Sequence, residues 1–277
     1  HGAFGCKLGT LAIGRTDSRL YNHFHFNPWT NIEENKERAA SRVQHWMPDL
    51  YKWINTHGHN HPVDFEFGHG HAHGDVPHHH GNGLDLSRVL AGPWATQALA
   101  DLGAEVIKIE RPDGGDDTRQ WGPPYAKDAQ GRDTTESAYY LSTNRGKRSV
   151  AVDLANPEGA HLVRKLAQCC DVFVENFKVG GLAKYGLAYG DLKSDNPAMI
   201  YCSISAFGQD GPDADKPGYD AMIQGMGGLM SITGEPDQRP VRVGTSIIDM
   251  AAGMWSVIGI VSALVRRRAT GEGASID

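Results

Sequence analysis

The chain has 277 residues, a formal net charge of −6 and an apolar content of 40%. Such a chain can build the core of one large domain or of two smaller ones, which excludes a disordered protein. The acidic balance excludes the basic footprint of a nucleic-acid binder. Four irregularly spaced cysteines do not form a disulfide framework, which favours a reducing, cytoplasmic location.

Histidine divides the sequence into two parts, because 13 of the 14 histidines precede residue 81 and only His161 follows. Residues 35–54 have an amphipathic helical pattern, and residues 57–83 form a tract rich in glycine and histidine. Imidazole can bind zinc, copper or nickel, but a structural zinc site needs ligands held at a fixed geometry. We therefore interpret residues 1–83 as an unassigned, His-rich and irregular segment with at most loose metal affinity.

Short apolar runs alternate with helical patterns from Leu84 onward. This alternation predicts βαβ units and a parallel α/β sheet, whose ligands bind at the carboxyl ends of the strands. The polar, Gly- and Pro-rich residues 112–134 predict a long loop. The predicted strands cover 84–89, 106–109, 149–154, 171–177 and 199–206, the predicted helices cover 94–102 and 157–170, and shorter helical pieces cover 182–185 and 190–195.

The expected strand ends bring one set of polar side chains to a common rim. Neither a Gly-x-Gly-x-x-Gly turn after the first strand nor a P-loop motif is present, so the sequence lacks a dinucleotide or P-loop signature. The residues expected at this rim are Ser87, Arg88, Glu110, Arg111, Asp153, Glu175, Asn176, Phe177, Ser205, Ala206 and Phe207.

Residues 250–265 form an uncharged run of sixteen residues, followed by three arginines. A membrane span with a positive flank is one interpretation. The run is shorter than the ~20 residues that cross a bilayer, so we favour a buried helix of the α/β domain and expect no membrane association.

Nine motifs in this second part resemble the class III CoA-transferases, the CaiB–BaiF family, and their order agrees over residues 84–277. The resemblance implies a Rossmann-like large domain, truncated here, which makes the chain part of a longer protein. It also implies an interlocked homodimer in that longer protein. The motifs are residues 85–93 (DLSRVLAGP), 103–112 (GAEVIKIERP), 115–119 (GDDTR), 121–124 (WGPP), 144–149 (NRGKRS), 171–177 (DVFVENF), 201–205 (YCSIS), 218–220 (GYD) and 227–234 (GGLMSITG).

The family's catalytic aspartate corresponds to Asp249, at the end of residues 240–249 (PVRVGTSIID). Asp249 falls in the expected first turn of the apolar helix, where the helix dipole should favour an ionised carboxylate. Such a carboxylate can attack a thioester and carry a covalent intermediate. The alternative is a structural capping box, because Ser246 and Asp249 have the Ser-x-x-Asp spacing.

The resemblance implies that an acyl-CoA and a small carboxylic acid are the substrates, with no tightly bound cofactor and no metal. Arg119 has two open interpretations, a contact to a distal carboxylate of the substrate or a salt bridge that braces its loop. The residues that match CoA contacts of the family are Leu90, Ala91, Arg111, Val152, Asp153, Asn176, Phe177, Lys178, Lys184 and Tyr219.

Tyr219 bears on the choice between transfer and racemisation. The related α-methylacyl-CoA racemases have histidine at this position, and a tyrosine ordinarily keeps its proton up to a pH of about 10. The loop motifs look most like succinyl-CoA:dicarboxylate transferases of the succinate–hydroxymethylglutarate type. We therefore predict CoA transfer, with a racemase, or an inactive fragment with a metal-binding His-rich segment, as alternatives.

Overall fold

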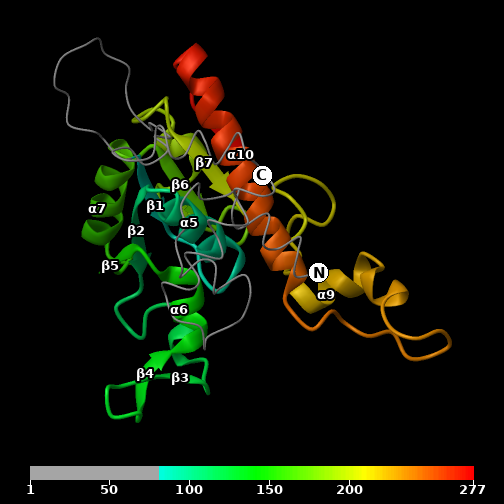
Figure 1. The fold of residues 1–277 in the computed structure, drawn as a ribbon. Coiled ribbons are helices and arrows are strands. Elements are labelled where there is room, and N and C mark those ends of the chain that lie inside the picture. The colour runs from blue at the N-terminus through cyan, green and yellow to red at the C-terminus, as the bar shows by residue number, and fades with distance from the viewer. Residues whose placement is uncertain (1–80) are drawn as a thin grey trace, which may run out of the picture. The chain divides into compact units, whose positions relative to one another are not determined.

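The computed structural model describes residues 81–277, so the helix and metal interpretations for residues 35–80 lie outside the described residues. Six strands form one sheet in the order β5-β2-β1-β6-β7-β8, and every neighbouring pair is parallel. The expected parallel α/β sheet is therefore confirmed (Figure 1). The strands are β1 (Asn82–Asp85), β2 (Glu105–Glu110), β5 (Lys147–Ala151), β6 (Val172–Glu175), β7 (Ile200–Ser203) and β8 (Ala274–Ile276).

Helices cover both faces of the sheet, with α7 on one side and α10 on the other (Figure 1). Successive side chains of β6 alternate between two cores, because strand side chains point to opposite faces. Phe173 packs with Val163 of α7, whereas Val172 and Val174 pack with Ile260 of α10. The helices are α5 (Ala91–Asp101), α6 (Ala138–Asn144), α7 (Pro157–Gln168), α8 (Tyr189–Leu192), α9 (Asp220–Met226) and α10 (Ile247–Thr270), with 3-10 turns η1 (Asp117–Gln120), η2 (Ala183–Tyr185) and η3 (Leu229–Ile232).

Several predicted boundaries are wrong, beginning with the first strand. It starts at Asn82 rather than Leu84 and ends at Asp85 rather than Val89. The strand stops early because the Asp85 carboxylate accepts a hydrogen bond from the Ser87 backbone N–H, which turns the chain. The first helix correspondingly starts at Ala91 and has Pro93 in its first turn. Proline is tolerated there because a backbone N–H in the first turn has no acceptor within the helix.

The predicted loop over residues 112–134 contains regular structure. Asp116 caps η1 by accepting a hydrogen bond from the Thr118 backbone N–H. The strands β3 (Tyr125–Lys127) and β4 (Asp133–Ser137) then pair in an antiparallel hairpin. Most of their side chains are at least partly exposed, so the sequence carries no apolar alternation that would predict them.

The apolar helix is longer than predicted and is buried on one face only. It continues through the three arginines to Thr270, where Gly271 ends it in the left-handed conformation. Its length of 24 residues, with a mean hydropathy of 1.8 over an 18-residue window, would suffice for a membrane span, so the length argument is wrong. Its contacts place it on the sheet, since Ile260 and Leu264 pack into a core with strand side chains. The opposite face exposes Met254, Trp255, Ile258 and Val265.

Candidate active site

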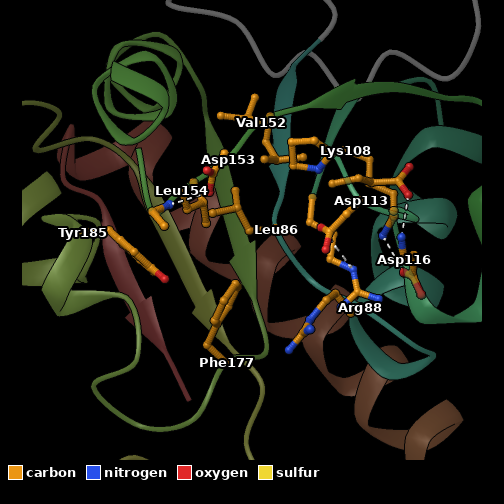
Figure 2. A pocket seen from close by; sticks show the side chains of 16 residues that line it. Leu86, Arg88, Lys108, Asp113, Asp116, Val152, Asp153, Leu154, Phe177 and Tyr185 are labelled. Carbon is orange, nitrogen blue, oxygen red and sulfur yellow. Dashed lines mark hydrogen bonds and ion pairs between the residues drawn. The ribbon is translucent and has the colours of Figure 1, made fainter. Parts of the chain in front are cut away.

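The strand order reverses between β1 and β6, because β2 and β5 lie beyond β1 whereas β7 and β8 lie beyond β6. In an open parallel sheet, such a reversal leaves a crevice at the carboxyl ends of the strands. A cavity of about 490 Å³ opens there, a size typical of small-molecule sites. Its lining follows β1, β2, β5 and β6 (Figure 2) and comprises Leu86, Arg88, Lys108, Ile109, Glu110, Arg111, Pro112, Asp113, Gly115, Asp116, Val152, Asp153, Leu154, Ala155, Phe177 and Tyr185.

The structure brings some, but not all, of the ten candidate binding residues to this cavity. Arg111, Val152, Asp153 and Phe177 line it. Lys184 instead lines a second cavity of about 330 Å³, which shares Leu154, Ala155 and Tyr185 with the first. The candidates that line neither cavity are Leu90, Ala91, Asn176, Lys178 and Tyr219.

Two guanidinium groups and an aromatic ring border the main cavity. Arg111 Nη2 donates to Asp117 Oδ1 at 2.7 Å. Arg88, which was not among the candidate binding residues, lies with its guanidinium carbon 5.4 Å from the centre of the Phe177 ring (Figure 2). Arg88 Nη1 also lies 3.8 Å from Asp117 Oδ2. Guanidinium groups suit phosphates and also stack on aromatic faces, so this border can hold a phosphorylated, ring-bearing ligand.

Asn176 acts on the backbone beside the cavity. Its Oδ1 accepts a hydrogen bond from the Arg88 N–H at 2.9 Å, and its Nδ2 donates to the Arg88 carbonyl at 2.7 Å. The amide group therefore ties the end of β6 to the turn that follows β1. If Asn176 also contacts a ligand, its Oδ1 or Nδ2 must bond the ligand and the Arg88 backbone at the same time.

The turn after β1 is held in a strained shape by buried charges. Val89 has a φ of 71°, which is unfavourable for a β-branched residue. Its N–H lies 3.3 Å from both carboxylate oxygens of Asp116. Lys108 Nζ lies 3.0 Å from Asp116 Oδ2 and donates to the Ser87 carbonyl at 2.8 Å. These contacts fix the backbone that leads through Leu90 to α5, which starts at Ala91.

Asp85 anchors the same network from the end of β1. Its Oδ2 lies 3.0 Å from Lys147 Nζ and accepts a hydrogen bond from Thr96 Oγ1 at 2.7 Å. Burial alone would raise the pKa of Asp85, but Lys147, Lys108 and the hydroxyl hydrogen bonds hold that pKa well below its usual range. The carboxylate is therefore ionised and locked inside the fold, so we assign it a structural role.

Arg119 braces its loop, which favours the salt-bridge interpretation of this residue. Its Nε and Nη2 donate to Glu110 Oε2 and Oε1 at 2.7 and 2.8 Å. The guanidinium carbon also lies 3.8 Å from the centre of the Tyr140 ring. Burial would raise the pKa of Glu110, but hydrogen bonds, with that from Arg119 the largest, lower it to about 2.

Asp249 lies in the first turn of α10, as predicted. The capping-box alternative is wrong, because the Ser246 side chain makes no capping hydrogen bond. Asp220, at the start of α9, instead accepts hydrogen bonds from the Ile248 and Asp249 backbone N–H groups at 2.7 and 3.3 Å. Two carboxylates from different helices are thus held close together, and Asp249 is half-buried beside Asp220.

The pKa of Asp249 changes in the direction opposite to the one that the helix dipole alone predicts. Burial and the neighbouring charge of Asp220 raise the pKa of Asp249 to about 6. The dipole favours the ionised form, but a half-buried carboxyl facing a second carboxylate has a larger opposing cost. At pH 7 the group is still about nine-tenths ionised, so it remains available as a nucleophile.

Two further residues complete the surroundings of Asp249, and the sequence did not single them out. The Tyr139 hydroxyl is hydrogen-bonded to Ser246, and burial together with the charges of Asp249 and Asp220 raises the pKa of Tyr139. Gly253 lies one turn after Asp249, where a Cβ atom would come within 2.7 Å of the Ala91 carbonyl oxygen. Glycine therefore allows α10 to approach the start of α5. Tyr219, directly before Asp220, is 77% exposed.

Residues 84–277 match the model of CoA-transferase family III, and the chain belongs to this family. The match includes the cavity and both carboxylates of the Asp249 site. The resemblance seen in the sequence is therefore confirmed.

Two named relatives are similar in sequence to this chain over about the same length. It is 56% identical over 194 residues to the succinate–glutarate CoA-transferase of Agrobacterium fabrum, a match that covers 70% of this chain and 48% of that protein. It is 50% identical over 194 residues to the succinyl-CoA:glutarate CoA-transferase of Homo sapiens, covering 70% of this chain and 43% of that protein. The chain thus spans about half the length of these relatives.

A solved structure gives the same answer for the fold. The crystal structure of a CAIB/BAIF family protein from Brucella suis superposes with a TM-score of 0.67 at 53% sequence identity. The superposition covers 71% of this chain and 51% of that one. The Rossmann-like sheet described above is therefore the fold of this family.

Proposed function

We propose that the whole protein transfers CoA from an acyl-CoA donor to a carboxylic acid through a covalent intermediate on Asp249. The observation that carries the proposal is the 56% identity over 194 residues to a protein named as a CoA-transferase. The position of Asp249 at the start of α10 supports its role as the nucleophile.

The chemistry needs one carboxylate that attacks and later leaves. An Asp249 oxygen attacks the thioester carbonyl of the donor, the C–S bond breaks, and CoA leaves as a thiolate, which gives an acyl–aspartyl anhydride. The thiolate then attacks the aspartyl carbonyl and releases the donor acid, which leaves an aspartyl–CoA thioester. The acceptor carboxylate attacks this thioester, the C–S bond breaks, and the CoA thiolate is released as an acceptor–aspartyl anhydride forms. The thiolate then attacks the acceptor's acyl carbon, which gives the acceptor's CoA thioester and frees the Asp249 carboxylate.

The cavity between β1 and β6 supports binding of the nucleotide part of CoA. Arg88 and Arg111 supply positive charge for phosphates, and Phe177 supplies a face for a planar ring. Val152 and Asp153 border the same space (Figure 2). The remaining proposed contacts are the backbone at Leu90 and Ala91, and the side chains of Asn176, Lys178, Lys184 and Tyr219.

The substrate class follows from the relatives' names, which include succinate, succinyl-CoA and glutarate. We propose succinyl-CoA as donor and a dicarboxylic acid as acceptor. The racemase alternative is not favoured, because these relatives are named as transferases.

A homodimer is proposed for the whole protein, in the cytoplasm. The support is the apolar face of α10, where Trp255 is 70% exposed and Met254, Ile258 and Val265 lie uncovered beside it. A contiguous exposed apolar face marks a protein–protein contact more often than free surface. The family resemblance favours a second copy as the partner.

The test uses the full-length protein with succinyl-CoA and glutarate, and follows glutaryl-CoA by chromatography. We expect Asp249→Ala to abolish transfer, and Glu272→Gln, which removes an exposed carboxylate at the far end of α10, to retain it. Full activity of Asp249→Ala would overturn the proposed mechanism. No transfer by the wild-type protein with any dicarboxylate would overturn the substrate class.

A further inference from the structure

The first turn of α10 takes its cap from another helix. The N–H groups at the start of an α-helix have no partner within the helix, and a side chain at the N-cap position usually accepts from them. Ser246 occupies that position and makes no such bond. Asp220 Oδ1 accepts instead, at 2.7 Å from the Ile248 nitrogen and 3.3 Å from the Asp249 nitrogen.

The capping carboxylate is itself held rigidly. Asp220 is buried, and its Oδ2 accepts a hydrogen bond from Gln224 Nε2 within α9. Gln224 is also buried, and its Oε1 accepts a hydrogen bond from the Val243 N–H at 2.8 Å. The chain on both sides of Ser246 is therefore tied to α9, and both oxygens of the Asp220 carboxylate accept hydrogen bonds.

We propose that Asp220 is the positioning residue of the transferase site: it fixes the first turn of α10 and places a second carboxylate beside Asp249. The proposal rests on the proposed role of Asp249 as nucleophile. Asp220 makes no bond to substrate in this role. It acts on Asp249 through the backbone N–H groups that it caps and through the effect of its own charge on the Asp249 carboxylate.

The charge of Asp220 bears on the covalent step itself. Two like charges repel more strongly in a partly buried site than in water. Both the anhydride and the thioester on Asp249 are uncharged at that side chain, so forming either one removes the repulsion. The free enzyme is thereby destabilised relative to the intermediate, which favours acylation. Burial is the larger cause of the raised pKa of Asp249, and the repulsion from Asp220 adds to it.

The groups that face Asp249 are few in the described part of the chain. Asp220 approaches from α9, and Tyr139 approaches from α6 with its hydroxyl bonded to Ser246. From α5, the Ala91 carbonyl lies near the Gly253 position and carries no titratable group. Because the pKa of Tyr139 is raised, its phenol stays neutral through the acid range. Asp220 is therefore the charge to remove in a test.

The experiment measures the titration of Asp249 in full-length protein by two independent methods. The first is the acid limb of kcat/KM for succinyl-CoA. The second is the pH dependence of carbodiimide labelling at Asp249, which reads carboxyl protonation by peptide mass spectrometry without requiring activity. The variants are Asp220→Asn, which removes the charge and keeps an Oδ1 acceptor, and Glu272→Gln as the matched control far along the helix.

We expect Asp220→Asn to move both titrations to lower pH and Glu272→Gln to move neither. With a pKa of about 6, about one Asp249 in eleven is ionised at pH 5, and a tenfold loss of proton affinity would leave about one in two ionised. Activity at pH 5, relative to pH 7.5, should therefore rise about fivefold in Asp220→Asn. If Asp220→Asn does not fold, Asp220→Ser removes the same charge, keeps an oxygen acceptor at the start of α9 and should shift both titrations in the same direction.

The outcomes separate this proposal from the proposed function. Titrations that stay at the wild-type pH in a folded Asp220 variant would overturn the positioning role. If the labelling titration moves while the acid limb of activity does not, the effect of Asp220 on Asp249 stands. In that case the nucleophilic role of Asp249 falls.

Discussion

Lys108 Nζ lies 3.0 Å from Asp116 Oδ2, and both side chains are completely enclosed. The pair joins the middle of β2 to the loop before η1, directly under the turn after β1. Both partners also bond that turn, Lys108 through the Ser87 carbonyl and Asp116 through the Val89 N–H. One buried ion pair therefore shapes the wall of the cavity proposed to hold CoA.

Lys108→Met should destabilise the full chain by about 3–5 kcal/mol, because it leaves the Asp116 carboxylate buried without its cation. Urea unfolding followed by circular dichroism measures this change. Lys127→Met is the matched control, since it removes a lysine from an exposed ion pair with Asp133, and should cost under about 1 kcal/mol. Equal costs for the two variants would contradict the assigned role of the buried pair.

Glu110 should give the protein a specific sensitivity to acid. Its pKa falls from an ordinary 4.5 to about 2 in the folded protein, with burial opposing and Arg119 leading the favourable contacts. A lowered pKa stabilises the fold above pH 4.5, and this contribution disappears as the pH falls toward 2. Glu110→Gln should therefore flatten the decline of unfolding free energy between pH 4.5 and 2. An unchanged slope would show that the carboxylate is not ionised in this contact.

The sheet could be predicted from sequence because each of its central strands is a buried apolar run. Val172, Phe173 and Val174 face cores on both sides, so burial alone marks the strand. The hairpin of β3 and β4 could not be predicted, because its strands are short and largely exposed. Local hydrophobic pattern carries information only where the local structure is buried.

The site could be predicted only in part, for a related reason. Asp249 was found because its motif and its helix are local in sequence. Its interaction with Asp220 joins residues 29 apart, and the Asn176–Arg88 contact joins residues 88 apart. Such contacts depend on the completed fold. For the same reason the sequence does not reveal the burial and the neighbouring Asp220 charge that raise the pKa of Asp249, and it gives the helix dipole too much weight.

Asp249→Asn should stabilise the full chain at neutral pH while removing activity. A carboxyl group with a raised folded pKa loses stability as it ionises, here as the pH rises from about 3.8 through about 6. The variant removes that cost, which we set at about 1 kcal/mol at pH 7 after allowing for partial exposure. Thermal unfolding at pH 7 and pH 3.5 checks this, with a gain expected only at pH 7. A loss of stability at pH 7 would contradict the account.

Gly253→Ala should displace α10 from the start of α5. The new methyl group would lie 2.7 Å from the Ala91 carbonyl oxygen and 2.9 Å from Trp94 Cδ1. Overpacking of this kind costs about 1–3 kcal/mol, and transfer activity should fall with it. Gly190→Ala in α8 is the control, because its methyl group would meet no atom within 4 Å. The two variants are compared by urea unfolding and by kcat/KM, and equal behaviour would refute the close approach.

Trp255→Glu should weaken self-association of the full-length protein. The substitution places a charge in the exposed apolar face of α10, whereas Leu162→Glu places one on an exposed position of α7. Light scattering coupled to gel filtration should report a monomer for the first variant at low micromolar concentration and a dimer for the second. A monomeric wild-type protein would contradict the proposed homodimer.

The most direct measurement traps the covalent intermediate on full-length protein. Wild-type protein is incubated with succinyl-CoA, treated with borohydride or hydroxylamine, digested and analysed by peptide mass spectrometry. The account predicts a reduced or hydroxamate-bearing residue at Asp249, absent when the acyl-CoA is omitted and absent in Asp249→Ala. Modification at another carboxylate, with Asp249 unmodified in an enzyme that is turning over, would contradict it.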